Sequence, residues 1–312
     1  MKLRKEGDRK DKMKKVKTKS ALLLLLTAII WGAAFVAQSA GADYAEAFSF
    51  TSIRSFVGGV VLIPCIFLFD RGRKKRGETA VHSDKKTLMT GGVLCGILLF
   101  IASSMQQIGI EYTTAGKAGF ITALYIVIVP IMGIFLKKYV GIQVWIGVIL
   151  AAAGLYFLCI TESFSIGTGD MYILLCAVCF SVHILVIDHY SPKVDGVKMA
   201  CIQFFVCSIL SAVPMILFEN PQLDRLLEGW LPIAYAGVMS CGVAYTLQIV
   251  GQRDSDPTIA SLILSLEAVV SVLAGFLLLD ERLTVREGIG CVLMFAAIIL
   301  AQLPGKEKKI AE

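Results

Sequence analysis

The chain has 312 residues, of which 56% are hydrophobic and only 17% are Asp, Glu, Lys or Arg. An ordinary soluble domain carries roughly 25% charged residues, so the composition argues against one. The net charge of +6 does not indicate nucleic-acid binding, because the basic residues lie in an N-terminal tail and in short loops between apolar runs. That distribution is typical of helices oriented in a membrane.

Apolar runs of membrane-crossing length recur along the chain. About 20 apolar residues cross a hydrocarbon core of about 30 Å, and backbone groups cannot be left open in lipid, so these runs are predicted to be helices. The first follows the basic tail, 1–19, and we expect it to be retained as a span because it is too long for a signal peptide. The ten predicted spans are 20–40, 48–69, 87–108, 114–136, 140–159, 170–188, 197–218, 229–251, 257–279 and 286–303.

Lys and Arg residues are distributed unevenly between the two sides that ten spans create. The tail and alternate loops hold most of them, whereas the opposite loops hold only Arg225, Arg282 and Arg286. Basic loops stay in the cytoplasm, so both termini, including the tail 304–312, are predicted to be cytoplasmic. The expected location is a bacterial-type plasma membrane.

The two halves of the chain, 20–159 and 170–303, are related in sequence. Ile53-Arg54 aligns with Ile202-Gln203, Cys95-Gly96 with Cys241-Gly242, and Thr122 with Ser265. Each half would hold five spans, an odd number, so the second half is predicted to be inverted relative to the first. The predicted fold is an all-α polytopic membrane protein of ten transmembrane helices in two inverted five-helix repeats. Such repeats recur in secondary transporters, although some channels share them.

Ionisable residues inside predicted spans are candidates for function, since a charge at a helix centre costs about 2.5–3.5 kcal/mol on insertion scales. Glu267 lies near the middle of the ninth span. It would bind a cationic substrate group, take up a proton during coupling, or fix packing through an interhelical hydrogen bond. His183, in the sixth span, is a candidate proton relay, but packing is the favoured interpretation.

Two basic residues lie within spans near the predicted outer face. Lys117 is expected to snorkel to the headgroups, with an anionic substrate group or Glu111 as alternative partners. Arg54 is expected to snorkel or to contact a carbonyl group. Both are secondary candidates for the site.

Uncharged side chains within the spans must also face one another or water. The ring of Trp31, next to Gly32, would wall a substrate or fill space between helices. Pro130 interrupts the hydrogen-bond ladder of the fourth span, which makes that helix a candidate gate or a bent wall. The remaining polar set comprises Gln38, Gln106, Gln107, Tyr125, Gln203, Tyr245 and Gln248.

Motifs for enzymatic chemistry are absent from the sequence. It contains no G-x-x-x-x-G-K-[ST], no H-E-x-x-H, no G-x-S-x-G and no acidic metal cluster. The nine cysteines fall inside apolar runs, which indicates neither a disulfide framework nor a metal site. We therefore expect no enzyme, no catalytic residue and no cofactor. A membrane-embedded lipid-handling protein or enzyme and a passive channel are the alternatives to a transporter.

The sequence resembles the EamA-like members of the drug/metabolite transporter superfamily over nearly all of residues 20–303. The matching motifs are Trp31-Gly32 with Phe35-Val36, Ser52-Ile53-Arg54-Ser55-Phe56, Tyr112-Thr113-Thr114-Ala115-Gly116-Lys117-Ala118 leading to Pro130, and the stretch from Ala260-Ser261-Leu262 through Ser265-Leu266-Glu267 and Asp280-Glu281-Arg282-Leu283-Thr284 to Gly288-Ile289-Gly290.

This resemblance implies ten helices around a central cavity, and export or exchange of small metabolites driven by ion gradients or by the substrate gradient. It places Trp31, Tyr125 and Glu267 near that cavity. The family often has proline directly after the glutamate, where this chain has Ala268, so the sequence offers no proline to kink the ninth helix. Leu124 aligns with Glu267, so the two halves are chemically unequal.

The expected function is that of a secondary transporter, an exporter or exchanger of small polar metabolites such as amino acids or drug-like compounds. Its expected partners are the substrate, membrane lipid and a coupling proton or ion, without nucleic acid. The sequence does not define an oligomeric state. The candidate substrate-binding or coupling residues are Glu267, Trp31, Tyr125, Gln106, His183 and Tyr245, with Pro130 as the candidate gating residue.

Overall fold

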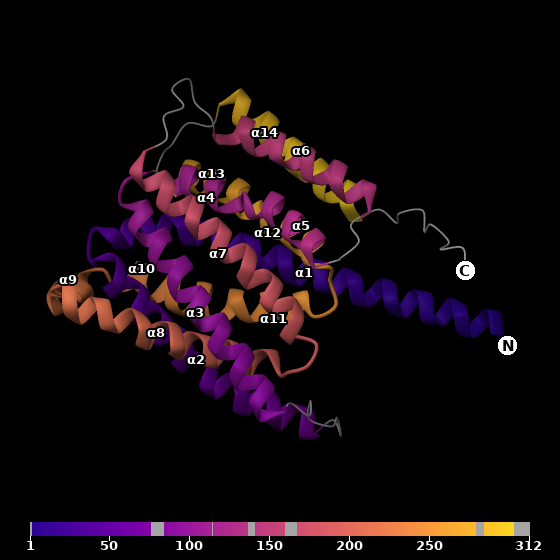
Figure 1. The fold of residues 1–312 in the computed structure, drawn as a ribbon, viewed down its shortest axis with the longest axis horizontal. Helices are drawn as coiled ribbons and strands as arrows, with labels where there is room; N and C mark the ends of the chain where they lie inside the picture. Colours follow the sequence, from indigo (N-terminus) through magenta and orange to yellow (C-terminus); the bar gives the residue numbers. More distant parts are fainter. Residues whose placement is uncertain are drawn as a thin grey trace.

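A computed structural model of the chain describes residues 2–75, 84–113, 115–136, 141–159, 167–278 and 284–302. The predicted tail 304–312, most of the loop between the second and third spans, Thr114 and the motif residues 280–283 lie outside the described residues. Within the described ranges the regular structure is entirely helical, and the helices pack as a bundle from which the N-terminal part of α1 projects (Figure 1).

Eight stretches are long and apolar enough to cross a membrane. Five of them lie in single helices: α1 (Lys2–Ala42), α2 (Ala47–Lys75), α3 (Lys85–Ile110), α7 (Thr168–Tyr190) and α8 (Gly196–Phe218). The other three are composite: α4 (Ala115–Ala123) with α5 (Tyr125–Phe135); α10 (Trp230–Ala234) with the π-helix η1 (Tyr235–Ala244) and α11 (Tyr245–Gln252); and α12 (Pro257–Leu264) with α13 (Leu266–Leu278).

Two shorter apolar helices correspond to the fifth and tenth predicted spans. They are α6 (Ile142–Cys159) and α14 (Val285–Gln302), which pack against one another along one side of the bundle (Figure 1). Their apolar stretches are 142–157 and 288–300, shorter than those of the other eight. A short helix, α9 (Leu223–Glu228), connects α8 to α10.

The fourth and ninth predicted spans are interrupted rather than continuous. The breaks fall at Leu124 and Ser265, so Pro130 lies inside α5, more than a turn after the first break. The second break occurs although Ala268 stands where the family often has proline. The Ser265 hydroxyl donates to the carbonyl of Leu262 at 2.7 Å. Serine hydroxyls that bond to the backbone compete with the helical ladder, which accounts for a break without proline.

Glycines let the helices that carry candidate site residues approach closely. A Cβ atom at Gly32 of α1 would overlap Val270 and lie 2.7 Å from the carbonyl oxygen of Glu267 on α13. A Cβ atom at Gly237 of η1 would lie 2.7 Å from a methyl carbon of Val57 and 3.1 Å from the carbonyl oxygen of Arg54 on α2. Small residues therefore bring α1 to α13 and α2 to η1, as they commonly do in membrane helix pairs.

The α2–α8 pair forms one unit, because charged groups join these helices at both ends. Glu219, at the end of α8, accepts hydrogen bonds from the backbone amides of Phe48 and Ser49 at 2.7 and 2.6 Å. These amides belong to the first turn of α2, where a carboxylate is favoured. The opposite ends are joined by the ion pairs Arg73–Asp195 at 2.6 Å and Lys198–Asp70 at 2.9 Å.

The Gly32→Ala variant should be less stable than the native protein by about 1–3 kcal/mol, because the added methyl group forces α1 away from α13. The matched control is Gly288→Ala, since a Cβ atom there meets nothing within 4 Å. Thermal unfolding of the purified proteins in detergent measures both effects. Equal melting temperatures for Gly32→Ala and native protein would contradict the required close approach.

Candidate functional site

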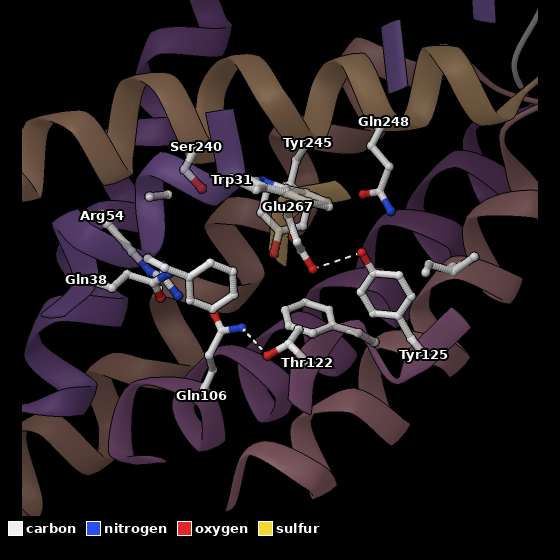
Figure 2. Close-up of a pocket in the computed structure, with 14 residues that line it drawn as sticks. Trp31, Gln38, Arg54, Gln106, Thr122, Tyr125, Ser240, Tyr245, Gln248 and Glu267 are labelled. Atoms are coloured by element: carbon white, nitrogen blue, oxygen red, sulfur yellow. Dashed lines mark hydrogen bonds between the residues drawn. The ribbon is translucent and has the colours of Figure 1, made fainter. Parts of the chain in front are cut away.

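A cavity lies where the two interrupted spans meet α1, α2, α3, α7 and the η1–α11 segment (Figure 2). Its lining mixes aromatic rings with amides, hydroxyls and two ionisable side chains, Arg54 and Glu267. Most of the surrounding core is aliphatic. The cavity is therefore where the polar side chains predicted from the sequence gather.

The acidic part of the cavity is a hydrogen bond between the two interrupted spans. The Tyr125 hydroxyl donates to Oε1 of Glu267 at 2.8 Å, as Figure 2 shows. Tyr125 directly follows the break at Leu124, and Glu267 follows the break at Ser265 by two positions. Both side chains are buried. Glu267 thus has a neutral donor, and it forms no ion pair with another described residue, so it can accept a proton or a cationic group from a ligand.

The basic part of the cavity is Arg54 of α2, which is only 4% exposed. Its NH1 group donates to Oε1 of Gln38 on α1 at 2.9 Å, and its Nε atom has no hydrogen-bond partner among the described residues. Of the two expected arrangements, snorkelling or a carbonyl contact, the structure has the second, because the side-chain carbonyl of Gln38 supplies an acceptor inside the bundle. Arg54 also forms no ion pair with Glu267 within the described structure.

Aromatic rings and a short amide network complete the lining. The rings of Trp31 and Tyr245 lie with centroids 4.6 Å apart and planes tilted by 59°. The indole Nε1 of Trp31 lacks a hydrogen-bond partner among the described residues. Gln106 donates from Nε2 to the Thr122 hydroxyl at 3.1 Å. The cavity therefore offers apolar ring surface together with a polar atom that a ligand can satisfy.

The other predicted site residues lie away from this lining. His183 is fully buried, with Nε2 3.2 Å from Oε1 of Gln203 and its ring against Tyr245. Its position agrees with the favoured packing interpretation. Pro130 is buried within α5 and is absent from the residues that line the cavity.

Lys117 pairs with a residue that the sequence analysis did not consider. Its Nζ atom lies 2.6 Å from Oδ2 of Asp170, so the proposed partnership with Glu111 was wrong. The first turn of α7 lies against α4, and this packing presents the carboxylate of Asp170 to Lys117. No signal in one sequence links two positions in different halves of the chain.

Sequence reasoning also missed part of the lining. From the sequence, Thr122 was named only as the position that aligns with Ser265, and Ser240 was not considered. A small polar residue in an apolar run is a weak indication that the residue lines a cavity. Three apolar lining residues carried no signal at all, because their types are common in every span: Ala34, Phe180 and Ile184. Phe35 entered only as part of a family motif.

A model of the EamA-like transporter family matches the chain twice, over residues 18–160 and 167–303. The chain belongs to this family. It is accordingly a multi-pass membrane protein of a transporter family, in agreement with the sequence resemblance and with the apolar helices.

Curated relatives match almost the whole chain. An uncharacterized transporter of Archaeoglobus fulgidus is 31% identical over 286 residues, covering 90% of this chain and 84% of the relative. The uncharacterized transporter YoaV of Bacillus subtilis is 20% identical over 301 residues, covering 94% and 99%. A solved crystal structure has the same fold, with a TM-score of 0.74 at 18% identity, covering 92% of this chain and 97% of that one.

The Tyr125→Phe variant should lose about 1–3 kcal/mol of stability, because it leaves a buried carboxyl oxygen of Glu267 without its donor. Tyr112→Phe is the matched control, since the Tyr112 side chain is 66% exposed. Thermal unfolding in detergent at neutral pH compares the two. If both variants melt with the native protein, the Tyr125–Glu267 hydrogen bond does not stabilise the junction of the interrupted spans.

Proposed function

We propose that this protein is a secondary transporter that exports or exchanges small zwitterionic metabolites, amino acids among them. The observation that carries this proposal is a buried cavity holding one basic and one acidic side chain, each bonded to a neutral partner rather than to the other. Membership of a transporter family supports the transport activity itself.

The two charged side chains favour a ligand that carries both complementary charges. A substrate carboxylate would bind the Arg54 guanidinium, whose Nε atom has no partner among the described residues, through charge-assisted hydrogen bonds. A substrate ammonium would bind Glu267. Because unpaired charges are expensive in a low-dielectric site, one zwitterion satisfies both groups at once.

The aromatic pair supplies the apolar part of such a site. Trp31 and Tyr245 present ring surface on which an aliphatic or aromatic substituent can pack, and the Trp31 indole supplies a donor. Glu267 would also take up a proton when no substrate ammonium is bound, which couples substrate movement to a proton. Drug-like cations with an apolar body fit the same chemistry less completely, since they leave Arg54 without an anion.

The proposed architecture behind this activity is ten transmembrane helices in two inverted five-helix repeats, with α6 and α14 as the fifth and tenth. Support comes from the two successive family matches and from the interruption of the fourth and ninth spans near aligned positions, Thr122 and Ser265. Inverted repeats permit alternating access about a shared central site. The distribution of Lys and Arg supports a plasma-membrane location with both termini in the cytoplasm.

Cells that express the native protein should accumulate a discrete set of zwitterionic metabolites outside, compared with cells carrying an empty vector. Glu267→Gln should reduce this export roughly tenfold or more, since about 1.4 kcal/mol of lost interaction corresponds to a factor of ten. Metabolite profiling of the medium, with expression matched in the membrane fraction, measures the effect.

The control for this experiment is Glu228→Gln, which alters an exposed carboxylate outside the cavity and should leave export unchanged. Identical profiles for native protein, Glu267→Gln and empty vector would refute export under those conditions. Counterflow into proteoliposomes then tests exchange, and flux that does not saturate with substrate would instead indicate a channel.

A further inference from the structure

The ion pair between Lys117 and Asp170 joins the start of α4 to the start of α7. Its two charged atoms lie 2.6 Å apart, and the Asp170 side chain is only 7% exposed. The same carboxylate accepts a hydrogen bond from the backbone amide of Gly167 at 2.8 Å. Asp170 is therefore held by the first turn of its own helix while it binds a side chain of α4.

The segment on the Lys117 side is short. Helix α4 has nine residues and ends where the helical pattern is interrupted at Leu124. Lys117 lies in its first turn, and Thr122, about 7.5 Å further along a helix, lines the cavity. A movement at Lys117 would therefore be transmitted directly to the wall of the site.

The segment on the Asp170 side is packed tightly. A Cβ atom at Gly169 of α7 would lie 2.8 Å from the carbonyl oxygen of Gly109 on α3, and one at Gly109 would overlap Ile173. By contrast, a Cβ atom at Gly116 or Gly119 of α4 would find only ordinary contacts, at 3.8 Å and 3.4 Å. The ion pair thus connects α4, most of whose residues are buried, to a helix that a close glycine contact holds against α3.

We propose that α4 is a gate at this end of the cavity and that Lys117–Asp170 is the latch that holds it closed. The proposal rests on the transport function proposed above, and it assigns the gate to the end of the bundle predicted to face outward. Gates of this kind are discrete two-state elements, whose equilibrium one added or removed contact can shift.

The latch would make the two ends of the transporter unequal. In the alignment of the two halves, Ala260 occupies the position of Lys117 and Ala21 the position of Asp170. These alanines lie on α12 and α1, which contact each other. At these two aligned positions, the end opposite the latch therefore has small apolar side chains where this end has opposite charges.

The test measures access to the cavity without any substrate. Ser240, which lines the cavity, is replaced by cysteine, and its labelling rate by a membrane-impermeant thiol reagent is measured in intact cells. The chain without the Ser240→Cys change supplies the background from native cysteines. Lys117→Met keeps an unbranched side chain, and Asp170→Asn keeps an acceptor for the Gly167 amide, so both remove charge with little change in shape.

Each single variant should raise the labelling rate about three- to tenfold, and the double variant should raise it no further, because both changes release the same latch. Lys117→Arg, which keeps the charge, should label at the native rate. Any of three results would overturn the latch. The labelling rate could be unchanged in both single variants, or the two effects could multiply in the double variant. The third such result is an equal labelling rate for Lys117→Arg and Lys117→Met.

The same reagent applied to inside-out vesicles tests which side of the membrane the gate opens to. An increase confined to these vesicles would overturn the outward assignment. If export fails while the variants still raise labelling, the transport proposal is refuted and the gate stands. If export is normal and labelling is unaffected, only the latch is refuted.

Discussion

The high cost of an unpaired polar group in a hydrocarbon environment constrains every feature of this protein. It makes the spans helical, and it requires each buried side-chain charge to have a hydrogen-bonding partner inside the bundle. Arg54 bonds to Gln38 and Glu267 to Tyr125, so each ionisable side chain has an uncharged partner inside the bundle and the two do not pair with each other. Such side chains remain available to a polar ligand, so the same constraint both holds the bundle together and produces its candidate site.

The interruptions in the fourth and ninth spans lie beside the buried polar side chains that this constraint requires to be paired. The interruptions at Leu124 and Ser265 lie next to the hydrogen bond between Tyr125 and Glu267. Glycines then set the distances: Gly32 lets α1 lie against the backbone of Glu267, and Gly237 lets η1 lie against that of Arg54. The same few positions, the two interruptions and the two glycines, therefore determine both the shape of the cavity and the packing of the helices around it.

A transporter also needs parts that move and parts that do not, and the two kinds are distinguishable here. The α2–α8 pair is joined at both ends by charged groups, and α3 meets α7 through a close glycine contact. The segments beside the interruptions carry the cavity residues Thr122, Tyr125 and Glu267. Rigid walls with short interrupted segments between them suit a mechanism in which small rotations open one end at a time.

Much of the site could be read from residue types alone. Glu267, Trp31, Tyr125, Gln106 and Tyr245 were all selected as polar or aromatic exceptions in apolar runs, and all of them line the cavity. The partners of Arg54 and Lys117 were not identified, since a local pattern does not show which other helix offers an acceptor. Their partners, Gln38 and Asp170, are on different helices, and Asp170 is in the other half of the chain.

Hydropathy and the positions of basic residues were enough to define a multi-pass helical membrane protein, because the transfer cost of each residue into lipid is a local property that adds along the chain. The motifs were enough to indicate its family. Which polar side chains meet, where a helix breaks without proline, and which charges face a cavity were decided by packing. Those outcomes depend on contacts between distant segments, and a single sequence does not record the contacts.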